Sequence, residues 1–311
     1  MSPFDLSAAT WGEVRKQDHY DWAILPWGST EPHNYHLPYG TDVICSSGIA
    51  CRVAEGLSAF GIHAMVLPGV PFGSQNPGQV NLPFCLHTRQ ETQAAILRDI
   101  VTSLKRQGIG RLLLINGHGG NSFKGMVRDL TAEDPSFLLL VSDWYTVLPQ
   151  KDYFEADMDD HAGEQETSVV MYFRPDLVKM EMAGTGESKR FAVDGLNGKV
   201  AWLPRDWSRV SVDTGIGDPS KASPEKGRRY VEHAVALDAG GNRVAYEQQV
   251  VGVGSGGARA GFGALGLLGA ALQRLDVHRL GVGHEDQAAD RNEHEHRADA
   301  HRDHVGANPL P

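Results

Sequence analysis

Four short apolar runs, separated by turn residues and by stretches of helical periodicity, dominate the first half of this chain. The predicted strands are residues 22–27, 63–67, 111–116 and 137–141. Strands that alternate with helices pair in parallel, because each helix returns the chain to the same end of the sheet. We therefore expect an α/β protein in which a mostly parallel central sheet lies between layers of helices.

The helices are expected between and after these strands. They are predicted at residues 43–57, 88–106 (starting at Thr88 or Gln90), 122–130, 169–173 and 224–237, with Ser223 as the N-cap of the last. Residues 68–83 are too long and too rich in proline and glycine for a simple connection, so we expect a loop over a site. In parallel sheets, sites form at the carboxyl ends of the strands.

Side chains that bind metals gather after the first predicted strand. Glu31 and His33 are two residues apart, so extended backbone would point both side chains the same way. Asp42 stands at the start of the following helix. Two carboxylates and an imidazole suit a hydrolytic zinc or manganese site, and a shared carboxylate can bridge two ions. The alternative is that this stretch is polar surface and Asp42 only the N-cap of its helix.

Two more clusters carry the same chemistry. His118 lies in the Gly-His-Gly-Gly-Asn turn that follows strand 111–116, where glycines let the backbone approach a ligand. A phosphate-binding loop is the alternative, but the turn lacks GxGxxG spacing and a P-loop lysine. Residues 159–168, Asp-Asp-His-Ala-Gly-Glu-Gln-Glu-Thr-Ser, open a predicted helix. The three clusters together predict a metal site.

Composition limits the partners. The 311 residues are 41% apolar and carry a formal charge of −10, which argues against nucleic acid or an anionic membrane as partner and favours small molecules. No apolar run approaches the roughly 20 residues of a membrane span, and the start lacks the basic and apolar regions of a signal peptide, so a cytoplasmic location is expected. Cys45, Cys51 and Cys85 form no CxxC pair and are expected to be reduced. Cys45 and Cys51, in the helix after Asp42, are expected to be small buried residues.

The composition changes beyond about residue 237. We expect one domain over residues 1–237 and an atypical tail over residues 238–311, which is rich first in glycine and then in His, Asp and Arg. Few aliphatic residues and irregular spacing favour disorder in the tail. A metal-binding tail and a reading-frame error are the alternatives.

The clusters also resemble a known family. Four motifs resemble the creatininase (creatinine amidohydrolase) family, in the same order and over roughly residues 20–235: Glu31-x-His33, Gly40-Thr41-Asp42, Asn116-Gly-His-Gly-Gly-Asn121 and His161–Ser168. The resemblance implies a three-layer α/β/α sandwich that opens a non-peptide C–N bond of a cyclic amide or formamide through a metal-activated water. It also implies a homo-oligomer, commonly a hexamer, and two divalent metal ions, expected to be Zn2+ with Mn2+ or Fe2+ as alternatives.

The resemblance further implies a ligand set. Glu31, Asp42 and His118 would hold one ion, and His33 with the bridging Asp42 the second. Creatininases proper have a glutamate for the second ion where this sequence has Gly120, and we expect Glu166, in preference to Glu164, to replace it.

Two further residues depart from the family's first motif. Pro32 and Asn34 replace its common Gln and Gly, which is expected to change the pocket and leave the ligands unchanged. Members with the glycine variant at position 120 include formamide hydrolases acting on pyrimidine intermediates, so creatinine is not the favoured substrate.

His161 matches the histidine that the family is proposed to use as proton carrier, and an imidazole titrates in the right range for that role. The alternative is a local hydrogen bond at a helix start. Trp144 and Tyr145 are either pocket or core residues.

Two other functions stay open. One is a non-catalytic metal-binding or small-ligand-binding protein, and the other is a metal-dependent phosphoesterase, which would need Arg or Lys that the three clusters lack. A serine hydrolase is not expected, because no GxSxG motif occurs.

Overall fold

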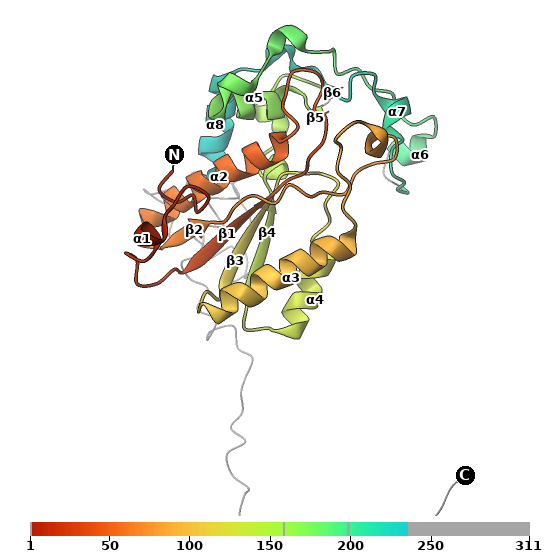
Figure 1. Cartoon of the computed structure of the whole chain (residues 1–311). Coiled ribbons are helices and arrows are strands. Elements are labelled where there is room, and N and C mark those ends of the chain that lie inside the picture. The colour runs from red at the N-terminus through yellow and green to blue at the C-terminus, as the bar shows by residue number, and fades with distance from the viewer. Residues whose placement is uncertain (1, 158, 198–199, 236–311) are drawn as a thin grey trace, which may run out of the picture. The chain divides into compact units, whose positions relative to one another are not determined.

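The computed structural model describes residues 2–157, 159–197 and 200–235. Its centre is a parallel sheet of four strands in the order β2-β1-β3-β4, which are labelled in Figure 1. The strands are β1 Trp22–Trp27, β2 Ala64–Val66, β3 Arg111–Asn116 and β4 Leu138–Asp143. The predicted parallel sheet is confirmed.

Strand β1 lies inside the sheet, and its burial on both faces explains its composition. All six of its residues are buried. Trp22 and Ile24 belong to the core on one face, and Leu25 to the core on the other, because successive side chains point to opposite faces. A strand covered on both sides needs apolar residues throughout, which is why the run contains no polar residue.

Helices cover both faces of the sheet, as Figure 1 shows. One layer consists of α2 Thr41–Ser58, α5 Glu164–Phe173 and α8 Pro224–Val235, and the other of α3 Gln90–Arg106 and α4 Lys124–Glu133. Each layer places its own apolar stripe on the sheet, so the core consists of two separate clusters. The fold is therefore the expected three-layer α/β/α arrangement.

Several short elements complete the described structure. They are α1 Trp11–Val14, α6 Asp194–Asn197, α7 Trp207–Val210, β5 Asp159–His161, β6 Ile216–Gly217, and the 3-10 helices η1 Gln79–Asn81, η2 Trp144–Thr146, η3 Gln150–Asp152, η4 Pro175–Leu177, η5 Met180–Met182 and η6 Pro219–Lys221. β5 pairs with β6 in a small antiparallel sheet, which the sequence did not predict.

Helix boundaries differ from the predictions by up to five residues, the largest difference being at α5, which begins at Glu164 and not at residue 169. α2 begins at Thr41 after the N-cap Gly40, so Asp42 lies inside the first turn and the N-cap alternative for this residue is wrong. α4 begins at Lys124, two residues later than expected. Ser223 Oγ accepts the Lys226 N–H, as an N-cap does. The predicted end of the last helix and the whole tail after residue 237 lie outside the described residues.

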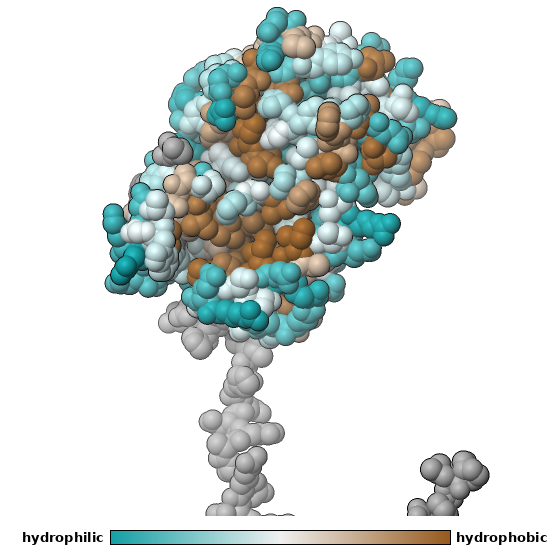
Figure 2. Space-filling view, viewed as in Figure 1, coloured by the Kyte–Doolittle hydropathy of each residue, from teal (hydrophilic) through white to brown (hydrophobic). Residues whose placement is uncertain are grey.

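The surface mixes polar and apolar side chains. Figure 2 shows apolar residues exposed on the part of the surface near α6 and α7, where Val193, Val200 and Trp202 are largely solvent-accessible. None of the described helices is long and apolar enough to cross a membrane.

Candidate metal centre

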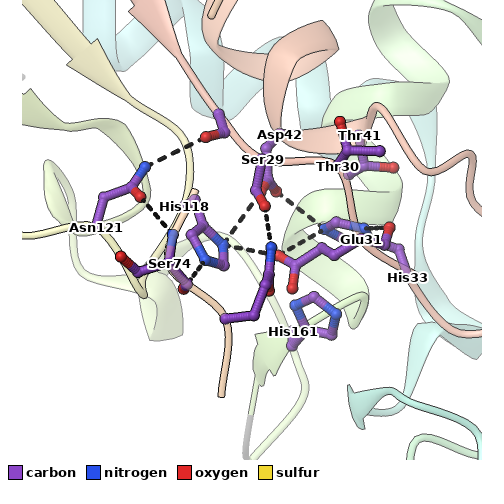
Figure 3. A network of polar contacts seen from close by, with 12 residues as sticks. Ser29, Thr30, Glu31, His33, Thr41, Asp42, Ser74, His118, Asn121 and His161 are labelled. Atoms are coloured by element: carbon purple, nitrogen blue, oxygen red, sulfur yellow. Dashed lines mark hydrogen bonds and ion pairs between the residues drawn. The ribbon is translucent and has the colours of Figure 1, made fainter. Parts of the chain in front are cut away.

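The carboxyl ends of β1 and β3 carry the two loops that the sequence singled out. Trp27 and Asn116 are the last paired residues of these parallel strands, so the loops that follow leave the sheet side by side. Gly28 and Gly117 both pack directly against the first turn of α2, where a Cβ on either would overlap Asp42. Three segments far apart in the sequence therefore meet at one place, and Figure 3 shows their polar side chains pointing toward one another.

Glu31, Asp42 and His118 form the first ligand group. All three are buried, and one potential ligand atom from each lies within 4.8 Å of the others. His118 Nδ1 is 2.7 Å from Glu31 Oε1 and 3.2 Å from Asp42 Oδ2. This is the set predicted for the first ion.

His33, Asp42 and Glu166 form the second group, again within 4.8 Å of one another. His33 Nε2 is 2.9 Å from Asp42 Oδ1 and 4.0 Å from Glu166 Oε2. Asp42 thus faces His33 with one carboxylate oxygen and His118 with the other. A carboxylate placed between two ligand groups in this way has the geometry to bridge two ions.

Hydrogen bonds to backbone carbonyls orient both imidazoles. The second nitrogen of His118, Nε2, lies 2.8 Å from the Ser74 carbonyl oxygen, and His33 Nδ1 lies 3.0 Å from the Glu31 carbonyl oxygen. Each contact requires an N–H on that nitrogen, so once the other ring nitrogen has lost its proton, its lone pair is directed into the space between the carboxylates. Metal-binding histidines are usually held by such an outer hydrogen bond.

The residues fit a divalent cation. Glu31 Oε1 and Asp42 Oδ2 are buried and accept no well-aligned hydrogen bond among the described residues, while both crowd His118 Nδ1, at 2.7 and 3.2 Å. An unpaired buried carboxylate oxygen is costly, and a positive ion between the carboxylates and the lone pairs removes that cost. Imidazole and carboxylate donors together suit Zn2+, Mn2+ or Fe2+.

The pKa values of His33, His118 and Glu166 also indicate that this site favours added positive charge. Burial opposes protonation of His33, but Asp42, Glu166 and Glu31 outweigh it and raise its pKa to about 10. Burial likewise opposes protonation of His118, yet Glu31 and Asp42 raise its pKa. Burial, together with the Asp42 charge, raises the pKa of Glu166 to about 8 against the opposing effect of His33. In the ion-free protein, protons supply part of the charge that a metal would bring.

Gly120 cannot carry the glutamate found in creatininases proper. A Cβ at this position would overlap the Ser74 carbonyl oxygen and approach His118 Nε2 to 2.5 Å. The same contact between Ser74 and His118 that orients the imidazole therefore requires a glycine here. Glu166 supplies a carboxylate from the other side, across His33.

Glu164, the alternative to Glu166, points elsewhere. It is fully buried, pairs with Lys226, and accepts the backbone N–H groups of Glu155 and Ala156 at 2.7 and 2.8 Å. Both of its carboxylate oxygens already have these partners, and among the described residues Glu166 and not Glu164 belongs to a ligand group.

The start of α5 positions Glu166 and His161. Ala162 adopts a left-handed backbone with φ of 52°, and its N–H donates to Glu166 Oε2 at 2.5 Å. Asp159 Oδ2 accepts the Gln165 N–H at 2.6 Å, which satisfies a free donor in the first turn of the helix. The turn between β5 and α5 thus fixes the carboxylate by its own backbone.

His161 lies beside these two ligand groups and forms a third group with Glu31 and His33, since one potential ligand atom from each lies within 4.8 Å of the others. Its Nε2 is 2.9 Å from the Pro32 carbonyl oxygen, and its ring centroid is 4.3 Å from that of His33. The alternative of a local hydrogen bond at the helix start is wrong, because the partner Pro32 belongs to the loop after β1. Burial, with the nearby His33, lowers the pKa of His161. The ring is therefore neutral near pH 7.

The structure also locates three other residues that the sequence analysis named, Asn34, Trp144 and Tyr145. Asn34, one of the two departures in the first motif, accepts the Gly184 N–H through Oδ1 at 2.8 Å and so ties the motif loop to a distant segment. Trp144 is fully buried in the core, whereas the Tyr145 hydroxyl lies 3.4 Å from Asn116 Nδ2, next to the His118 turn.

The sequence did not indicate the residues of loop 68–83 that contact the ligands. The Gln79 amide donates to Glu31 Oε2, and the Gln75 amide donates to the Ser29 hydroxyl. Ser74 contributes its carbonyl oxygen to His118. The loop therefore lies against the site as expected, but glutamine and serine in such a loop carry no spacing signal that would identify them individually.

Comparison with known proteins places this site in a family. The creatininase family pattern, described as creatinine amidohydrolase, matches residues 7–237. The creatinine amidohydrolase of Pseudomonas putida is 27% identical over 231 residues, which cover 68% of this chain and 85% of that protein. The mycofactocin precursor peptide peptidase of Mycobacterium ulcerans (strain Agy99) is 28% identical over 215 residues, which cover 66% of this chain and 78% of that protein.

Solved structures agree with this assignment. A crystal structure from Bacteroides fragilis NCTC 9343, assigned to the creatinine amidohydrolases, is 56% identical with a TM-score of 0.73 and covers 75% of this chain and 92% of that chain. A manganese form of creatininase and a mutant of zinc–zinc type are each 25% identical, with TM-scores of 0.60. They cover 74% and 75% of this chain, respectively, and 93% of their own chains. The chain therefore belongs to the creatininase family, whose members are amidohydrolases that act on carbon–nitrogen bonds.

Proposed function

We propose that this amidohydrolase is metal-dependent and uses two divalent ions to hydrolyse a C–N bond of a small cyclic amide or formamide. The observation that carries the proposal is the position of Asp42, whose two oxygens face His33 and His118 in two different ligand groups. Glu31 and His118 would complete the first ion's ligands, and His33 and Glu166 those of the second.

The number of ligands favours a hydrolase over a storage site. Each of the two groups that share Asp42 offers three residues. A four-coordinate ion held by three residues keeps one position for water, whereas a structural site fills all four. When bound, the two ions supply an activated water as nucleophile and polarise the amide carbonyl. Zn2+ is the first candidate and Mn2+ the second, in keeping with the metal forms of the solved creatininases.

Side chains of the protein itself would transfer the protons and orient the ligand carboxylate. The N–H on His161 Nε2 donates to the Pro32 carbonyl, which leaves Nδ1 as an acceptor. With its pKa lowered, His161 is neutral and ready to take a proton from the attacking water and deliver it to the leaving nitrogen. Gln79 holds Glu31 through the oxygen that does not face His118, so that the carboxylate keeps one orientation.

Two observations bear on the substrate. Gly120 lies where creatininases proper have a ligand glutamate, and Pro32 and Asn34 alter the loop beside the ligands. Creatinine is therefore not the first choice, and a cyclic ureide or a formamide is preferred. A peptide amide is the second candidate, because the mycobacterial relative is named a precursor peptide peptidase.

A substrate panel tests the proposal. Purified protein reconstituted with Zn2+ or Mn2+ is assayed with creatinine, cyclic ureides, small formamides and short peptides, with ring opening, formate or new amino groups as readout. We expect turnover of a cyclic amide or formamide that disappears after chelation and returns with metal. A His233→Ala variant, in which the altered histidine contacts Tyr153 away from the site, serves as the matched control for His161→Ala. Metal-independent turnover, or cleavage of peptides alone, would contradict the proposed reaction.

We also propose that the chain forms a homo-oligomer. The exposed apolar side chains of Phe84, Trp202 and Val212 support this, because monomers rarely leave many large apolar residues in solvent. Light scattering coupled to gel filtration is expected to give a multiple of 33.8 kDa, with a hexamer as the first candidate. A monomeric mass at micromolar concentration would contradict this part of the proposal.

A further inference from the structure

A second place in the described structure brings metal-binding side chains together. Of the four His/Cys/Asp/Glu groups that have metal-compatible spacing among the described residues, three belong to the candidate metal centre. The fourth consists of His19, Asp21 and His63, which we call the amino-end cluster. It lies at the opposite end of the sheet, because Asp21 directly precedes β1 and His63 directly precedes β2.

The parallel register of β1 and β2 creates this cluster. Trp22 pairs with Ala64, so the residues just before them are neighbours as well. The Asp21 N–H donates to the His63 carbonyl oxygen at 2.8 Å, and the His63 N–H donates to Asp21 Oδ2 at 2.8 Å. These two bonds hold the Asp21 carboxylate and the His63 backbone in fixed positions. Asp21 Oδ1 is left for another partner.

His19 reaches this free oxygen from the preceding loop. Its Nε2 is 3.6 Å from Asp21 Oδ1, and its ring centroid is 5.1 Å from that of His63. A separation of 3.6 Å is too long for a hydrogen bond. It is close to the ~3.3 Å between two ligand atoms of a tetrahedral ion with ~2.0 Å bonds.

Gln17 is placed to give His63 the outer contact that metal-binding histidines usually have. Its side-chain amide nitrogen lies 2.5 Å from His63 Nδ1, and a half-turn of the amide group would bring the amide oxygen there instead. In that orientation Nδ1–H donates to the oxygen and Nε2 keeps a free lone pair. Gln17, Tyr20 and His63 also line a cavity of about 640 Å3 beside α1.

The cluster is open to ions from solution. The His19 side chain is 65% exposed and that of Asp21 26% exposed. In Figure 2 the surface over α1, at the left of the view, is largely hydrophilic. We propose that the amino-end cluster is a separate surface site for a divalent transition ion such as Zn2+, with His19, Asp21 and His63 as ligands and water in the remaining positions. The ion would join the loop before β1 to the start of β2.

Zinc titration tests this site independently of catalysis. Full-length protein whose candidate metal centre is already loaded with Zn2+ is titrated with further Zn2+ by calorimetry. The wild type is compared with His19→Ala and His63→Ala, and His233→Ala is the control for an exposed histidine outside the cluster. All four proteins have the same histidines in residues 238–311, so any zinc binding by these residues is the same in each protein. We expect one binding event to weaken at least 10-fold in both cluster variants and to stay unchanged in the control.

Thermal unfolding supplies the second readout. An ion bound only to the folded state raises the midpoint of unfolding. Added Zn2+ is expected to raise the midpoint of the loaded wild type and of His233→Ala, and to leave that of His19→Ala unchanged. His19 lies in an exposed loop, so its variant keeps the test valid should His63→Ala fail to fold. Equal zinc binding and equal zinc-dependent midpoints in wild type and His19→Ala would overturn the proposal.

Discussion

At the scale of single residues, the candidate centre depends on which atom of each side chain is free. His33 and His118 each engage a backbone carbonyl with one ring nitrogen and face a carboxylate with the other. Asp42 lies between them and offers one oxygen to each. Removing a ligand and removing a proton carrier should therefore have different consequences.

His118→Ala and His161→Ala are expected to separate these roles. His118→Ala should lose metal and all activity, since one donor of the first ion disappears. His161→Ala should keep its metal while activity falls roughly 10²–10⁴-fold, the usual effect of removing a positioned acid or base. Metal analysis together with steady-state kinetics checks both. Full activity of the His161 variant would exclude its catalytic role, and loss of metal from it would make His161 a ligand.

Metal binding should release protons. In the ion-free protein His33 has a pKa raised to about 10 and Glu166 a pKa raised to about 8, so at pH 7 both are protonated. Both must lose their protons to become ligands, and metal affinity should therefore rise as the pH increases from about 6 toward 8 and beyond. Calorimetry at pH 7 in buffers of different ionisation enthalpy measures the number of protons released. A binding enthalpy that is independent of the buffer would contradict the prediction.

The ligand types were predictable from the sequence because they lie in short motifs with fixed spacing. Glu31 and His33 are two apart, and His118 occupies a glycine turn after a strand. Ser74 and Gln79 were not predictable, because their contacts join a loop of ordinary polar composition to distant side chains. The roles of the five ligands and of His161 in catalysis stay predictions.

At the scale of elements, the turn after β3 and the start of α5 shape the site. The β3 turn packs so closely that a Cβ on Gly120 would overlap the Ser74 carbonyl oxygen and the His118 ring, whereas among the described residues a Cβ on Gly119 would meet only the Tyr145 hydroxyl, at 3.9 Å. Neighbouring glycines in one turn therefore differ in the space around them, and the sequence alone does not distinguish them.

This difference gives a matched pair of variants. Gly120→Ala is expected to push Ser74 or His118 out of place, to lower stability by about 1–3 kcal/mol, and to weaken metal binding. Gly119→Ala makes an ordinary contact and should keep metal content near that of the wild type. Denaturant unfolding and metal analysis on both proteins check this. Equal behaviour of the two variants would contradict the close packing at Gly120.

The strands of the central sheet and the long helices were predicted with boundaries within five residues, whereas the short elements α1, β5 and β6 were missed. α2 starts at Thr41 because Gly40 takes the N-cap position, which moves Asp42 into the first turn. β5 was missed because a strand of three residues, Asp159–His161, contains no apolar alternation and forms only by pairing with β6.

At the scale of the whole molecule, the parallel sheet explains why the ligands meet. β1 and β3 are adjacent and parallel, so their carboxyl ends bring the Glu31 loop and the His118 turn together, while their amino ends lie at the other side. The parallel arrangement of the strands was predictable from the alternation of strands and helices along the sequence. The strand order β2-β1-β3-β4 was not predictable, because the pairing of distant strands depends on packing across the whole core.

In the proposed metal centre, two ions flank Asp42. X-ray diffraction of crystals grown with Zn2+, with data collected on both sides of the zinc absorption edge, tests it directly. We predict two anomalous peaks at this centre, one among Glu31, Asp42 and His118 and the other among His33, Asp42 and Glu166, with ligand distances of about 2.0–2.2 Å. A single peak, or peaks that leave Asp42 outside both coordination shells, would contradict the account.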